Sequence, residues 1–391
     1  MKEKLYQLLE EHKEEMIEIR RYLHENPELS FEEVETPKYI AAYHEALGHE
    51  VRVNVGGNGV VAKLVGGKPG KTVALRADFD ALAIEEQNDV PYKSKNPGVM
   101  HACGHDGHTA TLLVLAKVLN KMQAELAGTV VFIHQHAEEI APGGAIAMIE
   151  DGCLEGVDVI YGTHLWSTEP LGNFMTRTGP LMAAADSVEI KIEGRGGHGS
   201  EPHLTKDAIV IGAQFVTTLQ QLVARRVSPV QPAVVSIGSF VAENPFNVIA
   251  DSVKMAGTVR LFDEATRDVL EVEIEKVLQS ACSLTDATYQ YTYKRGYPPV
   301  INHEQQTNLS IDVAKTVPGI DTINICEPLM GGEDFAYYLQ HVPGSFFFTG
   351  ACDPTWEEVY PHHHPKFAID ERALLNAARL LGAITLEEMN K

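Results

Sequence analysis

The sequence predicts an α/β protein with a mainly parallel mixed sheet between helices, interrupted by an inserted α+β domain of the ferredoxin-like type. Two observations predict this. Apolar strands and helices alternate up to about residue 184, as they do around a buried, largely parallel sheet. From Ser187 the strands become one-side-solvated, and the first pattern resumes after residue 296. We therefore expect a main domain of residues 1–184 and 297–391 and an inserted domain of residues 185–296.

The first elements are predicted by helical spacing and turn residues. Apolar residues from Leu5 to Leu23 recur at helical spacing and predict an amphipathic helix. Thr36-Pro37 is typical of a helix start, and Gly48 of a helix stop. The expected elements that follow are strands 51–55, 60–65 and 72–75, a helix spanning Leu112–Met122, strand 129–134, helix 145–150 and strand 159–163.

The inserted domain has a different pattern. Residues 188–192 alternate apolar and polar side chains, which is typical of a strand with one face in water. The elements expected next are helix 208–223, strands 234–240 and 253–259, helix 264–278 and strand 288–293. The order β-α-β-β-α-β is that of the ferredoxin-like unit.

The composition excludes several classes of partner. The 391 residues include 54 acidic and 32 basic residues, which gives a formal charge of -22. Such a charge argues against nucleic acid or an anionic membrane as a partner. The sequence has no apolar run of signal-peptide type or of bilayer length. Its five scattered cysteines favour a reducing compartment, so we expect a cytoplasmic protein without structural disulfides.

A cluster of metal-binding groups precedes the third expected helix. Residues 101–108, His-Ala-Cys-Gly-His-Asp-Gly-His, contain a thiol, three imidazoles and a carboxylate. Thiolate, imidazole and carboxylate together suit zinc or a similar divalent ion. Cys103 and His105 can converge on one point only in a turn or an extended segment, and Gly104 permits that. A buried cysteine among surface histidines is the alternative for this motif alone.

Further donors follow other expected strands. The pair Glu138-Glu139 follows one strand, and His164 follows the next. Open α/β sheets bind ligands at the carboxyl ends of their strands, which favours a metal site over the alternative. Side chains of adjacent glutamates point apart in an extended segment, so one can bind metal while the other holds a water. Asp78 and Asp80 end the strand through residues 73–78 on one face, and we interpret Asp80 as a carboxylate that orients a histidine ligand, with a turn cap as the alternative.

Six separated motifs, in order, carry a family resemblance that runs from about Arg21 to Glu371. The chain resembles the amidohydrolase branch of the aminoacylase/carboxypeptidase superfamily of dinuclear metallohydrolases, which includes hippurate hydrolases. The motifs are Arg76–Leu82, His101–His108, Ala137–Glu139, Gly197-His198 with Pro202-His203, Gly332–Phe335 and His363–Pro365.

The resemblance implies two divalent ions per subunit, manganese or zinc, with cobalt or nickel as alternatives. It implies that Cys103 bridges the two ions and that Glu138 is the general base. It also implies that His198 of the inserted domain stabilises the oxyanion in the site of a partner subunit, and that Asn247 and Arg260 hold the substrate. The five implied ligands are Cys103, His105, Glu139, His164 and His363.

Some positions depart from the family pattern. His134 and His136 stand where phenylalanine and proline are more common, and we do not expect either to bind metal. His362 and His364 flank His363, whose choice as the ligand rests on the resemblance rather than on spacing. His108 is expected to support the site or the core, and His24 to be structural.

The expected function is metal-dependent hydrolysis of N-acyl amino acids of the N-acetyl or N-benzoyl type, by a homodimer that pairs through the inserted domain. A tetramer is an alternative to the dimer, and a second alternative is an inserted domain that serves only as a lid. A metallo-dipeptidase or carboxypeptidase is the alternative on the same site. Two others are a metal-free thiol amidase with Cys103 as nucleophile and a non-catalytic metal-dependent binding protein. Glu138 beside Glu139 argues against the last, because a binding protein needs no base.

Overall fold

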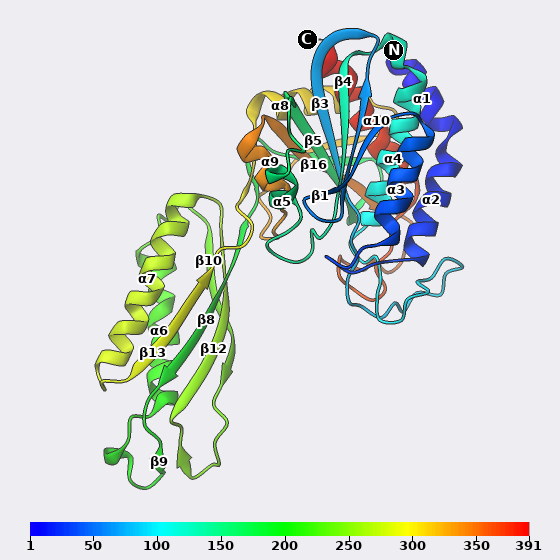
Figure 1. Ribbon diagram of the computed structural model, residues 1–391. Helices are drawn as coiled ribbons and strands as arrows, with labels where there is room; N and C mark the ends of the chain where they lie inside the picture. Colours follow the sequence, from blue (N-terminus) through cyan, green and yellow to red (C-terminus); the bar gives the residue numbers. More distant parts are fainter. Residues whose placement is uncertain (391) are drawn as a thin grey trace. The chain divides into compact units, whose positions relative to one another are not determined.

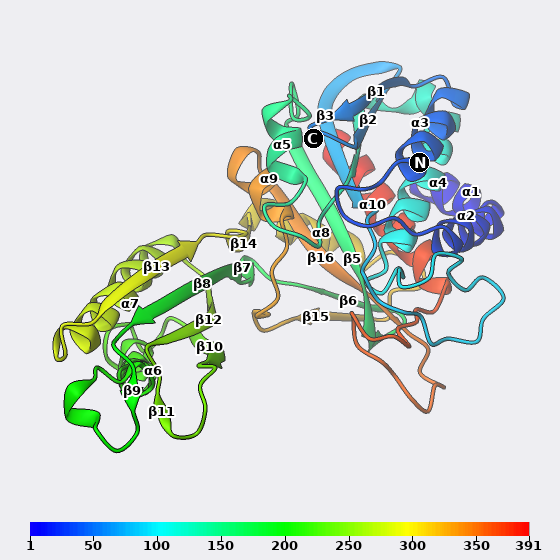
Figure 2. The ribbon, with the colours of Figure 1, turned by 60° about the horizontal axis from the view of Figure 1, so that its bottom comes forward.

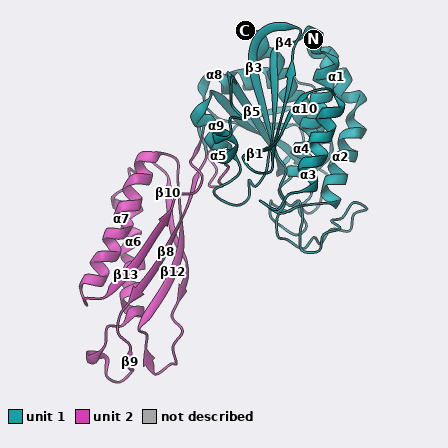
Figure 3. Ribbon diagram, viewed as in Figure 1, with its two compact units in different colours: residues 1–181, 301–327, 334–391 teal, residues 182–300, 328–333 magenta. Residues whose placement is uncertain are grey.

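A computed structural model describes residues 1–390, which form two compact units (Figures 1 and 3). Unit 1 contains residues 1–181 and 301–327 and the chain from residue 334 onward. Unit 2 contains residues 182–300 and 328–333. The insertion expected at 185–296 lies within unit 2, but that expectation did not include the short return at 328–333.

Within the described residues, unit 1 is built on an eight-stranded mixed sheet with the order β1-β2-β4-β3-β5-β16-β6-β15. β3 runs parallel to β4 and β5, and β16 runs parallel to β5. β1, β2 and β6 supply the antiparallel pairs. The strands are β1 (Glu50–Val55), β2 (Gly59–Val65), β3 (Lys68–Asp78), β4 (Ala127–Gln135), β5 (Val159–Pro170), β6 (Asn173–Thr176), β15 (Thr322–Ile325) and β16 (Gly344–Cys352), and the short β7 (Gly179–Met182) pairs with β14 (Val300–Asn302).

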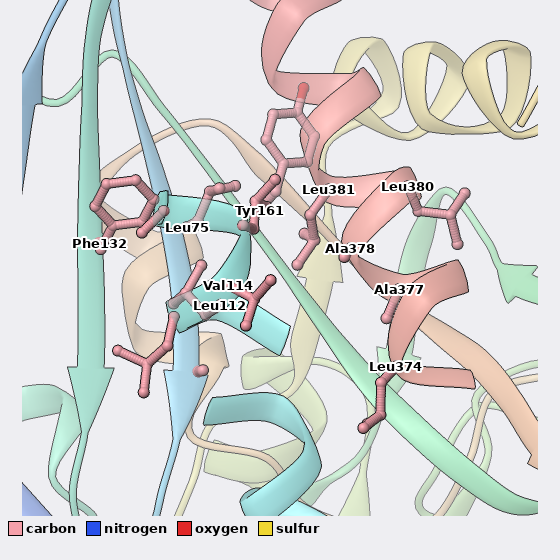
Figure 4. Packing of buried hydrophobic residues seen from close by; sticks show 14 of the residues in the cluster. Leu75, Leu112, Val114, Phe132, Tyr161, Leu374, Ala377, Ala378, Leu380 and Leu381 are labelled. Carbon is pink, nitrogen blue, oxygen red and sulfur yellow. The ribbon is translucent and has the colours of Figure 1, made fainter. Parts of the chain in front are cut away.

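Helices cover both faces of this sheet (Figures 1 and 2). On one face, α4 and α10 join the strands in a single core that includes Leu75, Phe132 and Tyr161 (Figure 4). On the other face, α9 places Phe335 against Phe346 of β16, with ring centres 4.8 Å apart. The helices of unit 1 are α1 (Lys2–Glu11), α2 (Lys13–Glu25), α3 (Glu35–Ala46), α4 (His105–Lys121), α5 (Ala145–Glu150), α8 (Glu304–Ala314), α9 (Phe335–His341) and α10 (Arg372–Met389), with a 3-10 turn at Gln123–Glu125.

Three details differ from the sequence expectations. The N-terminal amphipathic segment is two helices with a break at His12. α3 begins at Glu35, and its first N–H groups are capped by the carboxylate of Glu28 rather than by Thr36. β5 continues to Pro170 because it keeps pairing with β16, so His164 lies inside a strand and not at its end.

Unit 2 is a four-stranded antiparallel sheet with two long helices, as far as the described residues show, in the order β-α-β-β-α-β. The strand order is β10-β12-β8-β13, which is that of the ferredoxin-like unit. Apolar residues of both helices and of the inner sheet face form its own core. The elements are β8 (Ala184–Glu193), α6 (Ala208–Arg225), β10 (Ala233–Val241), β12 (Ser252–Leu261), α7 (Glu264–Ser283) and β13 (Thr288–Lys294), with short β9 (Gly197–His198), β11 (Val248–Ile249) and a 3-10 turn at Pro202–Leu204.

Two sequence expectations concern the chain as a whole. Among residues 1–390, no helix is both long and apolar enough to span a bilayer. All five cysteines are free thiols.

A chain of three buried histidines lies between α3 and β4. His44 Nδ1 is 2.9 Å from His49 Nδ1, and His44 Nε2 is 2.9 Å from His134 Nε2. A neutral imidazole has one donor and one acceptor, so neutral rings can make both contacts. Burial lowers the pKa of His44 to about 2 and that of His134 to about 3. The histidine noted at position 134 is therefore part of the core of unit 1, away from the residues expected to bind metal.

We predict that His134→Phe makes the protein less sensitive to acid. The pKa of His134 is lower in the folded state than in the unfolded state, so its neutral form favours folding above pH 6.5 and that stability is lost as pH falls. Between pH 7 and pH 5 the variant should lose about 2 kcal/mol less unfolding free energy than the wild type. Denaturant titrations at both pH values measure this difference, and the exposed His341→Phe is the control. An unchanged pH slope in His134→Phe would contradict the assignment.

Candidate metal centre

Three residues with positive φ shape the backbone around the predicted donors. Gly104 has φ of +95° between Cys103 and His105, Ala137 has φ of +52° just before the glutamate pair, and His363 itself has φ of +65°. Non-glycine residues rarely adopt this region, and such strain is concentrated at functional sites. The N–H of Ala137 donates to Glu33 at 2.9 Å, and that of His363 donates to the Ala102 carbonyl at 2.8 Å. These hydrogen bonds hold the turns in place.

His105 lies at the first position of α4, with one nitrogen engaged and the other facing carboxylates. Its Nδ1 donates to Asp80, 3.0 Å from the backbone oxygen and 3.2 Å from Oδ1. The same Asp80 carboxylate accepts from Ser30 at 2.7 Å and from the N–H of Glu139 at 3.0 Å. The lone pair of a neutral His105 is therefore on Nε2, which is the arrangement of a metal ligand oriented by a carboxylate. Asp80 has the contacts of the orienting carboxylate that the sequence predicts.

Cys103 and His164 approach each other from the loop before α4 and from β5. The Cys103 Sγ is 3.3 Å from His164 Nε2. His164 Nδ1 donates to the Leu165 carbonyl at 2.8 Å, which leaves the Nε2 lone pair directed at the thiol. Burial lowers the pKa of His164 well below its usual value, so the ring is neutral, as a metal ligand must be.

Glu139 connects this pair to the remaining predicted ligands. Its Oε1 is 3.8 Å from His105 Nε2, and its Oε2 is 3.2 Å from His363 Nε2. Glu138 is also buried, with Oε2 3.9 Å from His105 Nε2. The structure thus gathers all five predicted ligands and the predicted base around one point.

Two buried polar atoms in this cluster have no hydrogen-bond partner among the described residues. They are Glu139 Oε1, an acceptor, and His105 Nε2, which is an acceptor when the ring is neutral. Buried polar groups are nearly always satisfied, so two unsatisfied acceptors 3.8 Å apart call for a cation. Donor atoms of Cys103, His105 and Glu139 lie within 4.8 Å of one another, and so do those of Cys103, His164 and His362. The two groups share Cys103, and their thiolate, imidazole and carboxylate donors fit a pair of zinc-like divalent ions.

The electrostatics also favour a cation. Burial lowers the pKa of His105, but Asp78, Asp80 and Glu139 raise it more, to about 10, so without metal the ring holds a proton that a bound divalent ion would replace. Burial and the nearby carboxylates raise the pKa of the Cys103 thiol well above its usual value. A thiol in such surroundings is not a thiolate without a cation, which disfavours Cys103 as a metal-free nucleophile.

A second group of buried residues supports the donors, and of these the sequence predicts such a role only for His108. Asp78 accepts from Arg76 at 2.5 Å and from His108 Nδ1 at 2.6 Å. His108 Nε2 then accepts the N–H of Leu165 at 2.9 Å, so this histidine supports the residue next to His164. Arg76 also donates to Asp334 at 2.9 Å. These residues hold the end of β3 and the start of α4 against the middle of β5.

Two other histidines lie outside the donor cluster, and a further buried glutamate lies beside the Ala137 turn. Two histidines that could be mistaken for ligands, His24 and His136, are not in the donor groups. His24 contacts Asp106 at 2.8 Å, and the His136 ring lies edge-on to Phe31. Glu33, which sequence reasoning missed, is buried beside the Ala137 turn, and burial raises its pKa to about 7.

The predicted residues of unit 2 fall into two places. The N–H of Gly199 donates to the Asn247 carbonyl at 2.8 Å, so Asn247 lies next to exposed His198, whose Nδ1 accepts from Ser200. Arg260 lies near the other end of β12, where it pairs with Ala185 and Val234. Ser252, eight residues before it, pairs with Glu193, close to the β9 end. At about 3.3 Å per residue, Arg260 is roughly 26 Å along the strand from that end.

The family model described as peptidase family M20/M25/M40 matches residues 74–387, which include every residue of the donor cluster. The chain belongs to this family. As a member of family M20, it is a hydrolase that acts on amide bonds.

Relatives and a solved structure of the family agree with this assignment. The chain is 42% identical to "Thermostable carboxypeptidase 2" of Saccharolobus solfataricus, over 100% of this chain and 99% of that protein. It is 45% identical to "N-acyl-L-amino acid amidohydrolase" of Geobacillus stearothermophilus, over 78% and 82%. The Bacillus subtilis YXEP structure, described as a dinuclear metal binding peptidase of family M20, matches with a TM-score of 0.84 at 36% identity, over 97% of this chain and 99% of that one.

We predict that Asp80→Ala weakens metal binding. Removing the carboxylate frees the His105 ring to rotate and removes the acceptor of the Glu139 N–H, and such losses typically cost 10–100-fold in metal affinity. Competition with a chromophoric chelator measures the affinity. Ser30→Ala, which removes only one donor to the same carboxylate, should have a smaller effect. Wild-type affinity in Asp80→Ala would show that Asp80 does not orient the ligand.

Proposed function

We propose that this M20 hydrolase cleaves the amide bond of N-acyl amino acids of the N-acetyl or N-benzoyl type, with two divalent ions per subunit. The observation that carries the proposal is the buried cluster in which Cys103 is shared by two groups of donors, with Glu138 beside it. The relative named as an N-acyl-L-amino acid amidohydrolase supports the substrate class. The ligands proposed are Cys103, His105, Glu139, His164 and His363, and the ions proposed are manganese or zinc, with cobalt or nickel as substitutes.

Each residue has a distinct task in this mechanism. Bound divalent ions supply Lewis-acid chemistry, which lowers the pKa of a water and polarises the scissile carbonyl. Glu138, held beside the donors, takes a proton from the water and delivers it to the nitrogen of the leaving amino acid. His198 donates a hydrogen bond to the developing oxyanion. Asn247 and Arg260 hold the substrate, and the guanidinium of Arg260 binds the free carboxylate of the substrate.

The positions of the unit 2 residues favour a site shared by two subunits. His198 and Asn247 lie at one end of the sheet, and Arg260 is roughly 26 Å along β12 from Ser252, which lies close to that end. An N-acetyl amino acid is far shorter than this distance. One copy of unit 2 therefore cannot supply all three contacts to a single substrate. We infer a homodimer in which His198 and Asn247 serve the metal centre of the partner subunit.

We predict that Glu138→Gln keeps its metal and loses turnover. Glutamine retains the shape of the side chain but cannot accept the proton, so hydrolysis of N-acetyl amino acids should fall by about 10²–10⁴-fold. Release of free amine measures turnover, and elemental analysis measures metal content on the same sample. The exposed Glu150→Gln is the control and should behave as wild type. Substantial activity in a metal-replete Glu138→Gln enzyme would remove Glu138 as the base.

We predict that two inactive variants restore activity when they are mixed. A dimer of one Glu138→Gln subunit and one His198→Ala subunit has one metal centre with an intact Glu138 served by an intact His198 from the partner. Co-refolded mixtures should therefore regain activity. Each mixed dimer contributes at most one working site. If His198 acts within its own subunit, every site in the mixture lacks one group and no activity returns.

A further inference from the structure

His362 precedes the proposed ligand His363 and also contacts the metal centre. Its ring centre lies 5.0 Å from that of His164 and 4.6 Å from that of Trp166. Side chains of adjacent residues alternate in an extended strand. The φ of +65° at His363 breaks that alternation, so two successive histidines can face one site.

The distances place His362 with the donors on one side of the cluster. One ring nitrogen of His362, one ring nitrogen of His164 and the Cys103 sulfur all lie within 4.8 Å of one another. Around a tetrahedral zinc ion, ligands at about 2.0–2.3 Å lie some 3.3–3.7 Å apart. The His164–Cys103 distance of 3.3 Å already fits this geometry.

The hydrogen bonds of His362 match those of the ligand His164. The Leu165 carbonyl accepts from His164 Nδ1 at 2.8 Å and from His362 Nε2 at 3.1 Å. The tautomer of His362 that keeps this bond has its lone pair on Nδ1. Leu165 itself is held by His108, which accepts its N–H at 2.9 Å. One fixed peptide group therefore orients two imidazoles beside Cys103.

His364, two residues after His362, makes different contacts. It stacks on Tyr360 with ring centres 4.5 Å apart, and its Nδ1 accepts the N–H of Lys366. His364 is thus a matched control from the same segment.

We propose that His362 is a further protein ligand for the divalent ion held by Cys103 and His164. The inference rests on the metal centre proposed above. A second imidazole beside a thiolate makes this position rich in nitrogen and sulfur, which favours zinc, cobalt or nickel over manganese. His362 therefore contributes to the metal preference of one of the two positions.

The test compares wild type, His362→Leu and His364→Leu after removal of metal with EDTA. Competition with a chromophoric chelator gives the affinity for Zn²⁺ and Mn²⁺, and the visible absorption of the Co²⁺-loaded protein reports coordination number. In His362→Leu one of two Zn²⁺ ions should bind at least tenfold more weakly, with a smaller change for Mn²⁺. Its Co²⁺ absorption spectrum should change, because one nitrogen ligand is lost from the coordination sphere. His364→Leu should match wild type in both measurements.

The experiment distinguishes failure of the proposed metal centre from failure of the proposed role of His362. Wild type that does not bind two ions overturns the metal centre itself. Wild type that binds two ions, with His362→Leu unchanged in Zn²⁺ affinity and Co²⁺ spectrum, overturns only the role of His362. If His362→Leu does not fold, His362→Gln keeps a donor for the Leu165 carbonyl and offers only a weak amide ligand, so the same criteria apply to it.

Discussion

The structure of unit 1 depends on the burial of several carboxylates at one edge of its sheet. Asp78, Asp80 and Glu138 are all buried within a short distance of His105, with Glu139 beside them. Like charges in a low-dielectric interior repel and are costly to desolvate, so such a group persists only with compensating positive charge. Arg76 compensates Asp78 and Asp334. Asp80 and Glu139 face His105, and divalent cations bound there would compensate their charge.

The scaffold keeps these charges in place from two sides. On the helical side, Arg20 of α2 is buried and its Nε lies 2.8 Å from Asp106, the residue after His105. His24 contacts the same carboxylate. The start of α4, which carries His105, is therefore held by charged groups of α2. On the strand side, the Asp78–His108–Leu165 hydrogen bonds fix the backbone of β5 beside His164. Metal affinity thus depends on residues that never touch the metal.

The sequence predicts the metal-binding residues of the site better than the hydrogen-bond partners that position them. Cys103, His105 and Glu139 are found because thiols, imidazoles and carboxylates at strand ends suggest metal binding, and Asp80 because it follows a strand. The Leu165 carbonyl could not be found in this way, since a backbone acceptor has no residue signature. Glu28 caps α3 from outside the helix, and no local pattern in Thr36-Pro37 reveals it.

Other misses have the same origin in long-range contacts. The end of β5 was placed too early because pairing with β16, almost two hundred residues later, extends it. The role of His134 depends on His44, ninety residues earlier. The order of the long strands and helices of unit 2, by contrast, follows from local alternation and agrees with the prediction.

The most direct test of the account is turnover after chelation and metal replacement. The protein is stripped with EDTA, reloaded with Zn²⁺, Mn²⁺, Co²⁺ or Ni²⁺, and offered N-acetyl amino acids, N-benzoyl amino acids and dipeptides while free amine is measured. The proposed mechanism predicts no hydrolysis without metal and metal-restored hydrolysis of N-acyl amino acids in preference to dipeptides. Full activity in the stripped protein would contradict the metal mechanism. Metal-restored cleavage of dipeptides alone would contradict the substrate class and identify an exopeptidase.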